Sequence, residues 1–333
     1  MKTSIVILNW NGCHFLEKYL PGVVSCSQLP DVEVIVADNA SNDDSVTYLQ
    51  ENHPQIRIIR LDRNYGFAEG YNRTLQQLDA DFYVLLNSDV EVTEGWLQPM
   101  LDLMQKKPDM AACMPKIRST ADRSLFEYAG AAGGFMDKYG YTFCRGRLFQ
   151  TVEKDAGQYD SEMEIFWATG ACCMIRAKLF SEMGGFDSLF FAHMEEIDLC
   201  WRLKNAGYTI WYTPNSVVYH VGGGMLPQSS PLKTFLNYRN NLLMMYKNLS
   251  PRHHRRRIMY IRMTLDGLSV VYSLLKGDFS TLKTVWKAHQ EYRKLRREYR
   301  LPSEKTGYPS CVYQRSVVYQ YFIKRHQTFE NLP

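Results

Sequence analysis

The chain has 333 residues, of which 45% are hydrophobic and 22% charged, and is long enough for one large domain or two. No apolar run reaches the roughly 20 uncharged residues of a membrane span, and the N-terminal apolar run is too short for a signal peptide. The eight cysteines include no Cys-x-x-Cys pair, so we interpret them as reduced core residues rather than disulfides or a zinc site. These features predict a cytoplasmic globular protein.

The net charge of +4 is unevenly distributed along the chain. From Ser250 onward there are 17 Lys and Arg against 6 Asp and Glu, whereas acidic residues outnumber basic ones before it. An acidic body that carries a basic tail predicts a different partner for each part.

The N-terminal third alternates between strand and helix patterns. Apolar runs at Thr3–Leu8, Val32–Ala37 and Ile56–Leu61 predict buried strands, and the segments between them have helical spacing. Ser41 is expected to cap the second helix. This alternation predicts an α/β fold with a parallel, doubly wound sheet. The first turn has no Gly-x-Gly-x-x-Gly and no P-loop, so a bound nucleotide would be held by side chains and a metal.

A fourth apolar run, Phe82–Leu86, ends abruptly in Asn87, Ser88 and Asp89. The first two strands likewise end at Asn9 and Asp38. Because open α/β sheets bind ligands at the carboxyl edge of their strands, these polar residues predict a binding site there.

The middle of the chain is less regular. Trp96–Met104 is expected to be a helix and Met110–Pro115 a short strand, but residues 117–164 show little periodicity and contain a Gly-rich stretch at 128–134. We interpret 117–164 either as a variable, partly mobile region near a substrate or as an ordinary decorated loop.

A second polar cluster follows a predicted strand, Gly170–Arg176, and a short helix. Glu195, Glu196 and Asp198 fall in the first turn of a helix that ends near Gly207, where anions are favoured. Asp198 and Arg202 are four residues apart and are expected to form a structural pair. Two further strands are predicted, Tyr208–Tyr212 and Val217–Tyr219, the second followed by His220 and a glycine run at 222–224.

Asp89, His220 and the acidic pair are the candidate chemical groups. Carboxylate, imidazole and phosphate oxygens together suit Mn²⁺ or Mg²⁺ better than Zn²⁺. Such an ion would act as a Lewis acid on a diphosphate leaving group, while a separate carboxylate deprotonates an attacking hydroxyl. Each residue taken alone is more often structural, so the hypothesis depends on their combination.

These stretches together resemble family 2 glycosyltransferases of the GT-A fold, and in particular bacterial rhamnosyltransferases of polysaccharide assembly. The resemblance implies inverting transfer from a nucleotide-diphosphate sugar, and a single displacement with one base agrees with it. The matching stretches are Ile5–Gly12, Val36–Asp43, Asn64–Asn72, Leu85–Asp89, Thr169–Arg176, Gly184–Asp187, Phe190–Arg202 and Tyr219–His220.

The resemblance also implies roles for individual residues. Asp89 would bind the metal with His220, and Glu196 would be the general base beside Glu195. Asp38 would hydrogen-bond a uracil or thymine base, which implies a UDP- or dTDP-linked donor such as dTDP-rhamnose, although guanine remains open. The residues expected to bind the nucleotide sugar are Asn9, Asp38, Asn64, Gly66, Asn87, Ser88 and Gly170.

Two positions depart from the family pattern. Asn87 replaces the first acid of the Asp-x-Asp site, which leaves one fewer negative charge near the metal. Glu196 replaces the usual aspartate, which leaves open whether Glu195 or Glu196 is the base. A catalytically inactive sugar-nucleotide-binding protein is therefore an alternative function. A sugar nucleotidyltransferase is a weaker one, because the first turn, Asn9–Gly12, lacks the Gly-rich activating loop.

The expected domains are a catalytic domain at 1–225 and a basic helical region at 226–333. The catalytic domain is expected to have a nucleotide-sugar half at about 1–116 and an acceptor half at about 117–225.

Within the C-terminal tail, Ile258–Leu275 is apolar but interrupted by Arg262 and Asp266. The tail suits an anionic membrane surface at the inner face of the plasma membrane, with a solvated cap or a homo-oligomer contact as the alternative. No nucleic-acid-binding motif accompanies the charge. The acceptor is expected to be a saccharide or lipid-linked.

Overall fold

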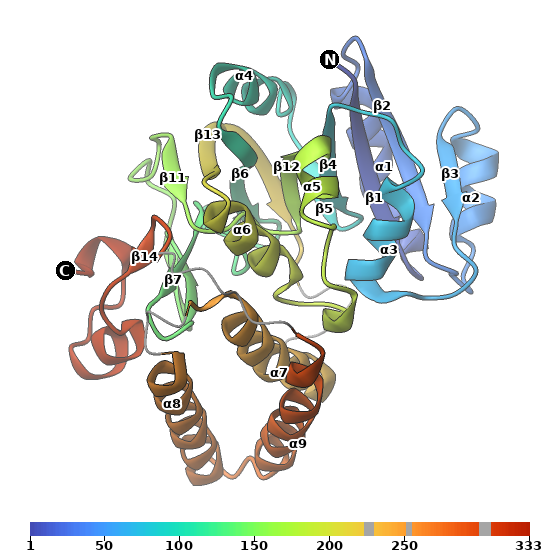
Figure 1. Ribbon diagram of the computed structural model, residues 1–333. Coiled ribbons are helices and arrows are strands. Elements are labelled where there is room, and N and C mark those ends of the chain that lie inside the picture. Colours follow the sequence, from blue (N-terminus) through green and yellow to red (C-terminus); the bar gives the residue numbers. More distant parts are fainter. Residues whose placement is uncertain (223–229, 251–254, 300–307) are drawn as a thin grey trace.

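The computed structural model describes residues 1–222, 230–250, 255–299 and 308–333 (Figure 1). Part of the predicted glycine run at 222–224 and the basic residues 252–254 lie outside this described part. The strands of the main sheet are β1 (Thr3–Asn9), β2 (Val32–Asp38), β3 (Arg57–Arg60), β4 (Phe82–Asn87), β5 (Val90–Val92), β6 (Met110–Ser119), β11 (Met163–Ile165), β12 (Cys172–Arg176) and β13 (Thr209–His220). The strands of a second sheet are β7 (Gly134–Asp137), β8 (Thr142–Cys144), β9 (Arg147–Leu148), β10 (Thr151–Val152) and β14 (Val312–Tyr313).

Helices surround the main sheet and form a separate layer below it (Figure 1). The α-helices are α1 (Cys13–Cys26), α2 (Ser45–Asn52), α3 (Gly66–Leu75), α4 (Gln98–Lys106), α5 (Ala177–Glu182), α6 (Glu195–Asn205), α7 (Pro231–Asn248), α8 (Arg255–Leu275) and α9 (Ser280–Leu295). The short turns of helix are η1 (Ser188–Phe190), η3 (Arg296–Glu298), η4 (Tyr319–Ile323) and η5 (Phe329–Asn331).

The main sheet confirms the α/β prediction, but it is mixed rather than uniformly parallel. Its strand order is β11-β13-β6-β12-β4-β1-β2-β3, with β5 paired to β13. The strands β4, β1, β2 and β3 are parallel, as the alternation of strand and helix predicts. β12 is inserted between β4 and β6 and is antiparallel to both.

The register of the parallel strands brings their polar ends together. Asn9 of β1 lies opposite Asp38 of β2, and Leu8 lies opposite Asn87 of β4. On the other half of the sheet, His220 ends β13 opposite Val90 of β5. The polar ends of strands that are far apart in sequence therefore share one edge of the sheet.

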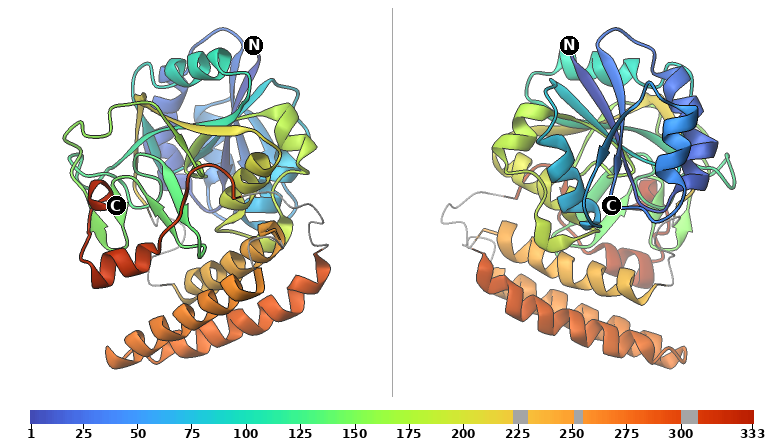
Figure 2. Two further views of the ribbon diagram at one scale, coloured as in Figure 1. Left: turned by 60° about the vertical axis from the view of Figure 1, so that its left-hand side comes forward. Right: turned by 90° about the vertical axis from the view of Figure 1, so that its right-hand side faces the viewer.

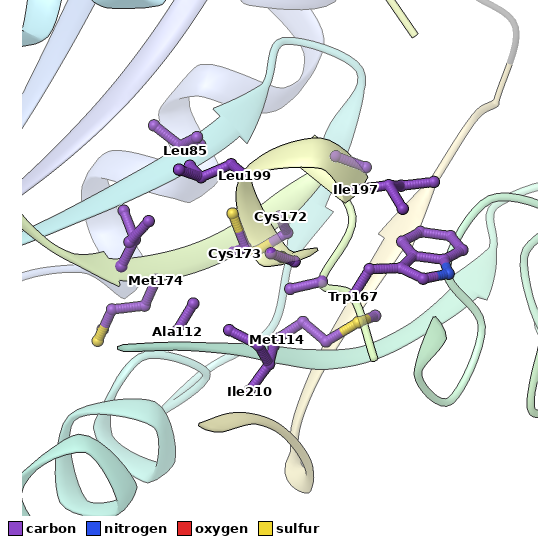
Figure 3. Close-up of a cluster of buried hydrophobic side chains, with 14 of the residues drawn as sticks. Leu85, Ala112, Met114, Trp167, Cys172, Cys173, Met174, Ile197, Leu199 and Ile210 are labelled. Atoms are coloured by element: carbon purple, nitrogen blue, oxygen red, sulfur yellow. The ribbon is translucent and has the colours of Figure 1, made fainter. Parts of the chain in front are cut away.

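Helices cover both faces of the sheet and bury its apolar side chains. α1 and α2 lie on one face, and α3, α5 and α6 lie on the other (Figure 2). Ile197 and Leu199 of α6 belong to the same buried hydrophobic cluster as Leu85, Cys173 and Met174 of the sheet (Figure 3). Full burial of one such aliphatic side chain stabilises the fold by about 1.5–3 kcal/mol. The eight cysteines are free, as predicted.

Three local predictions differ from the structure. Ser41 does not cap α2, which begins at Ser45; the Ser41 hydroxyl instead accepts a hydrogen bond from the backbone N–H of Asn11. Residues 117–164 are not a decorated loop, since they form β7–β11 and most of the second sheet. The two strands predicted around 208–219 are one strand, β13, with a bulge between Thr213 and Val217 that interrupts its pattern.

The C-terminal region is not helical throughout. α7, α8 and α9 pack together below the catalytic body, but the chain then returns to it, and β14 pairs in parallel with β7 (Figure 1). By length and composition alone, α8 is long and apolar enough to cross a membrane. Its two charged interior residues, Arg262 and Asp266, form a buried ion pair at 2.9 Å. The domain boundary near residue 225 stays a proposal.

Candidate active site

A cavity of about 360 Å³ opens at the shared edge of the main sheet. It is lined by both polar clusters of the sequence, although they are more than 100 residues apart. The predicted site residues in its lining are Asn64, Gly66, Asn87, Asp89, Gly170, Glu195, Glu196 and His220. Asn9, Asp38 and Ser88 are predicted site residues that are buried behind this lining.

Asp89 and His220 meet at one end of the cavity. The His220 Nε2 atom lies 3.1 Å from Asp89 Oδ1, and both side chains are buried. On the other side of the ring, Nδ1 lies 3.5 Å from Oε2 of Glu127, which is ion-pair distance without a well-aligned hydrogen bond. His220 is therefore held between two carboxylates.

These carboxylates control the charge of His220. Burial by itself lowers the pKa of this imidazole, but the hydrogen bond to Asp89 and the nearby negative charges of Glu127 and Asp89 outweigh it and raise the pKa to about 10. The ring is thus a cation that balances two acids. A divalent cation could bind these groups once His220 releases its proton, because an imidazole ligates a metal through a neutral ring nitrogen; the ion would then supply the positive charge between the two carboxylates.

The loop before α3 forms another wall. The Asn64 side-chain oxygen accepts hydrogen bonds from the Gly66 backbone N–H at 2.8 Å and from the Asn39 side chain at 3.1 Å. Gly66 has a φ of 73°, and a Cβ there would lie 2.5 Å from the ring of Phe191. This position therefore requires glycine both for its backbone conformation and for the close approach of Phe191.

Asn9 and Asp38 lie side by side beneath this wall. Asp38 Oδ2 accepts a hydrogen bond from the Ser41 backbone N–H at 3.1 Å. One buried oxygen of each residue, Asn9 Oδ1 and Asp38 Oδ1, has no hydrogen-bond partner. Buried acceptors without partners are costly, so a ligand that donates an N–H to this place would be stabilised.

The acidic pair lies across the cavity, in the first turn of α6. Three residues that precede it have left-handed backbones, with φ values of 63° at Phe191, 70° at His193 and 74° at Met194. Non-glycine residues in this region cost about 1–3 kcal/mol each, and such strain often occurs at functional sites. The Phe191 carbonyl accepts hydrogen bonds from the first N–H groups of α3, which joins this loop to the Gly66 wall.

Burial raises the pKa of both members of the acidic pair. Burial and the charge of Glu196 raise the pKa of Glu195 well above its ordinary value. Burial likewise raises the pKa of Glu196, but backbone N–H groups at the helix start oppose it and leave the pKa at about 7. Glu196 can therefore take up and release a proton near neutral pH.

Residues 4–184 match the family described as glycosyl transferase family 2, which is more than half of the chain. The chain belongs to this family. The glycosyltransferase is 29% identical over 232 residues to the N-acetylglucosaminyl-diphospho-decaprenol L-rhamnosyltransferase of Mycobacterium tuberculosis, over 65% of this chain and 75% of that protein. The predicted resemblance to rhamnosyltransferases is thereby confirmed.

Solved structures confirm the predicted GT-A fold of this glycosyltransferase. S. aureus TarS 1-349 in complex with UDP-GlcNAc matches with a TM-score of 0.58 and 13% identity, over 88% of this chain and 80% of that one. GalNAc-T7 with UDP, GalNAc and Mn2+ matches with a TM-score of 0.57 and 17% identity, over 74% of this chain and 47% of that one. At such identities the likeness concerns the fold alone.

Several cavity residues of the glycosyltransferase were not predicted from the sequence. Glu127 comes from the 117–164 region, whose lack of periodicity hid it, and Lys233 comes from the start of α7. Trp10 also lines the cavity and is 38% exposed. A tryptophan in the turn that follows β1 was the one available sequence clue, since exposed aromatic residues in turns often contact ligands.

α7 holds the acidic end of the site in place. The Asn240 side-chain amide donates hydrogen bonds to the carbonyls of Phe190, Ala192 and His193, at 2.8–2.9 Å. Asp198 of α6 is fully buried and binds Arg202 at 2.9 Å, which confirms the predicted structural pair. Asn240 is thus a positioning residue for the strained loop.

We predict that Asn240→Asp will lower turnover by roughly a hundredfold, the scale expected when reacting groups shift by about 1 Å. The aspartate cannot donate to the three carbonyls, so the loop and the acidic pair will move. The matched control is Asn241→Asp on the same helix, which loses one bond to the Gly140 carbonyl, away from the cavity. Both variants are assayed for turnover and thermal unfolding; equal losses of turnover would contradict a specific role for Asn240.

Proposed function

We propose that this glycosyltransferase moves rhamnose or a related hexose from a dTDP- or UDP-linked donor to a hydroxyl of a saccharide or lipid-linked acceptor, with inversion, in cell-surface polysaccharide synthesis. The observation that carries the proposal is that one cavity is lined by the Asp89–His220 pair and by a carboxylate whose pKa is near 7. The mycobacterial relative is an N-acetylglucosaminyl-diphospho-decaprenol L-rhamnosyltransferase, which supports this donor sugar and a lipid-linked acceptor.

A divalent cation, Mn²⁺ or Mg²⁺, fits the Asp89 end of the cavity. Asp89 and the deprotonated His220 ring would hold it, with Glu127 adding negative charge nearby. Within the described ranges no three His, Cys, Asp or Glu side chains are arranged to hold a metal, so the donor's diphosphate oxygens would complete the coordination. When bound, the ion offsets charge on the leaving diphosphate. The Mn2+ in the GalNAc-T7 structure supports this choice.

The acidic pair would carry out the proton transfer. Glu196 takes the proton of the acceptor hydroxyl as that oxygen bonds to the anomeric carbon and the bond to the diphosphate breaks. Glu195, in its protonated form, donates a hydrogen bond to the sugar or the acceptor. A single displacement of this kind inverts the anomeric configuration.

The remaining proposed contacts concern the nucleotide and the membrane. Asp38 and Asn9 would receive the N–H of a pyrimidine base with their free oxygens, while Asn64, Gly66, Asn87, Ser88 and Gly170 form the rest of the nucleotide-sugar site. The basic C-terminal region would place the enzyme at the inner face of the plasma membrane.

An inactive sugar-nucleotide-binding protein is the second candidate, because Asn87 replaces an acid at the metal site. The two functions differ in one measurement. Release of nucleotide diphosphate that requires both the sugar nucleotide and an acceptor supports transfer, and binding of the sugar nucleotide without release supports the inactive protein.

We predict that Asp89→Ala will abolish transfer and greatly weaken nucleotide-diphosphate binding, because it removes a metal ligand and leaves His220 with one carboxylate. The matched control is Glu91→Ala, which removes a surface ion pair with Arg123 and leaves the cavity lining intact. Calorimetric titration with and without Mn²⁺ measures the binding. Full activity in excess chelator with tight donor binding would show that no metal is needed.

We predict that turnover will rise with pH through about 7 and then level off, because the Glu196 base must be ionised. Glu196→Gln keeps the shape but accepts no proton, so turnover at saturating donor should fall by roughly a hundredfold or more, with the pH dependence lost. Glu195→Gln should mainly raise the KM for the acceptor. If Glu196→Gln turns over at the wild-type rate while Glu195→Gln is inactive, the two roles are reversed.

We predict that UDP or dTDP will bind more tightly than GDP, since a carboxylate at Asp38 accepts the single N3–H of a pyrimidine base. Asp38→Asn should weaken both pyrimidine diphosphates and leave GDP binding little changed. Competitive calorimetry measures all three affinities. A wild-type protein for which GDP outcompetes both pyrimidine nucleotides would refute the assignment of the base.

A further inference from the structure

The end of the hairpin formed by α8 and α9 exposes an unusual number of large apolar side chains. Leu275 is 83% exposed, Phe279 is 72% exposed and Trp286 is 62% exposed. We call this surface the hairpin tip, and it projects away from the catalytic body (Figures 1 and 2). It consists of Leu268, Val271, Tyr272, Leu275, Phe279, Leu282 and Trp286.

The apolar residues of the tip follow helical spacing on both helices. Leu268, Val271 and Leu275 are three or four residues apart on α8, so they form one stripe. Phe279, Leu282 and Trp286 have the same spacing at the start of α9. At a rise of about 1.5 Å per residue, both stripes lie within roughly 10 Å of the turn that joins the helices.

Other residues of the hairpin are buried, so the exposed stripes do not result from loose folding. Val270, Val285 and Ala288 are buried, and α7 packs on both α8 and α9. Asp266 of α8 binds Arg262 at 2.9 Å and His289 of α9 at 3.2 Å. Among the described residues nothing packs on the tip, since these apolar side chains are about half exposed or more.

Positive charge surrounds the apolar tip. Lys276, Lys283 and Lys287 are all exposed next to its residues. The neighbouring acid, Asp278, is engaged by the hydroxyls and backbone N–H groups of Ser280 and Thr281. Surfaces that bind at the boundary between lipid headgroups and acyl chains typically have this composition, with exposed Leu and Phe side chains beside Trp, Tyr and Lys.

We propose that the hairpin tip inserts into one leaflet of an anionic lipid bilayer and anchors the enzyme there. The roughly 10 Å height of the apolar stripes matches the depth of about 5–10 Å at which interfacial helices bury their apolar faces. A second copy of the chain is a poorer occupant. A symmetric contact between two tips would bring the three lysines close to their own copies, and like charges repel.

This inference rests on the membrane localisation in the proposed function and deepens it. Membrane binding is attributed to insertion of apolar side chains rather than to net charge alone. α7 links the two sites, because Leu232 and Lys233 at its start line the cavity and its body packs on α9 and α8. An anchored tip would therefore hold the cavity at a fixed position relative to the membrane, where a lipid-linked acceptor lies.

The test is flotation with vesicles of phosphatidylcholine alone or mixed with phosphatidylglycerol, without donor or acceptor. The wild-type protein should bind both, and bind the anionic vesicles more tightly, with that preference falling as salt rises. Leu275→Ser with Phe279→Ser should lower the partition coefficient on both by roughly tenfold or more. Lys276→Gln with Lys283→Gln should remove only the preference for anionic lipid.

The matched control is Ile323→Ser, which removes another apolar side chain that is 65% exposed, away from the tip. Its binding should equal that of the wild type. Trp286 fluorescence, taken as the difference from Trp286→Phe, should be quenched by lipids brominated near the headgroup more than by lipids brominated deep in the acyl chain.

Three results would overturn the proposal: unchanged binding by the Leu275 and Phe279 variant, stronger quenching by the deep bromines, or a lipid-free dimer that the same variant dissociates. Transfer to a soluble acceptor is measured in parallel. If the variant keeps this activity but loses the vesicles, the anchor and the catalytic function are separate, and each can fail alone.

Discussion

The acidic end of the site depends on the ion pairs and the hydrogen bond that the buried carboxylate of Asp198 makes. This carboxylate is fully buried and binds Arg202 of its own helix, and also Lys247 at 3.0 Å and Asn248 at 2.7 Å on α7. These partners keep the pKa of Asp198 below its ordinary value despite burial. Loss of one partner from a buried ion pair typically costs about 3–5 kcal/mol, because a charge is left unpaired. The α6–α7 contact is therefore fixed rather than adjustable.

The two ends of the cavity are built by different means. At the strand-end side, the register of parallel strands places Asn9, Asp38 and Asn87 next to one another, and strand pairing leaves little freedom. At the acidic end, a helix start and a strained loop carry the functional groups, and α7 must support them from outside.

Electrostatic balance links these ends. His220 is buried as a cation between Asp89 and Glu127, whereas Glu195 and Glu196 are buried without a cation and therefore hold protons more tightly. The same cavity thus holds a buried cation between two carboxylates at one end and raises the pKa of two other carboxyl groups at the other end.

The sequence by itself determined the local elements and the chemistry available to them. The strands near Thr3, Val32 and Phe82 could be predicted because an unbroken apolar run that ends in a polar residue depends only on neighbours in the chain. The acidic pair at the start of α6 and the family resemblance followed from motifs of the same local kind.

Tertiary structure alone decided how these parts meet. Asp89 and His220 are 131 residues apart, and their contact depends on the pairing of β13 with β5 and β6. Glu127 joins them from a region without periodicity, and the antiparallel β12 and the exposed hairpin tip could not be read from any single segment. Long-range contacts depend on how all the apolar faces of the chain pack together, and a local sequence pattern does not determine this packing.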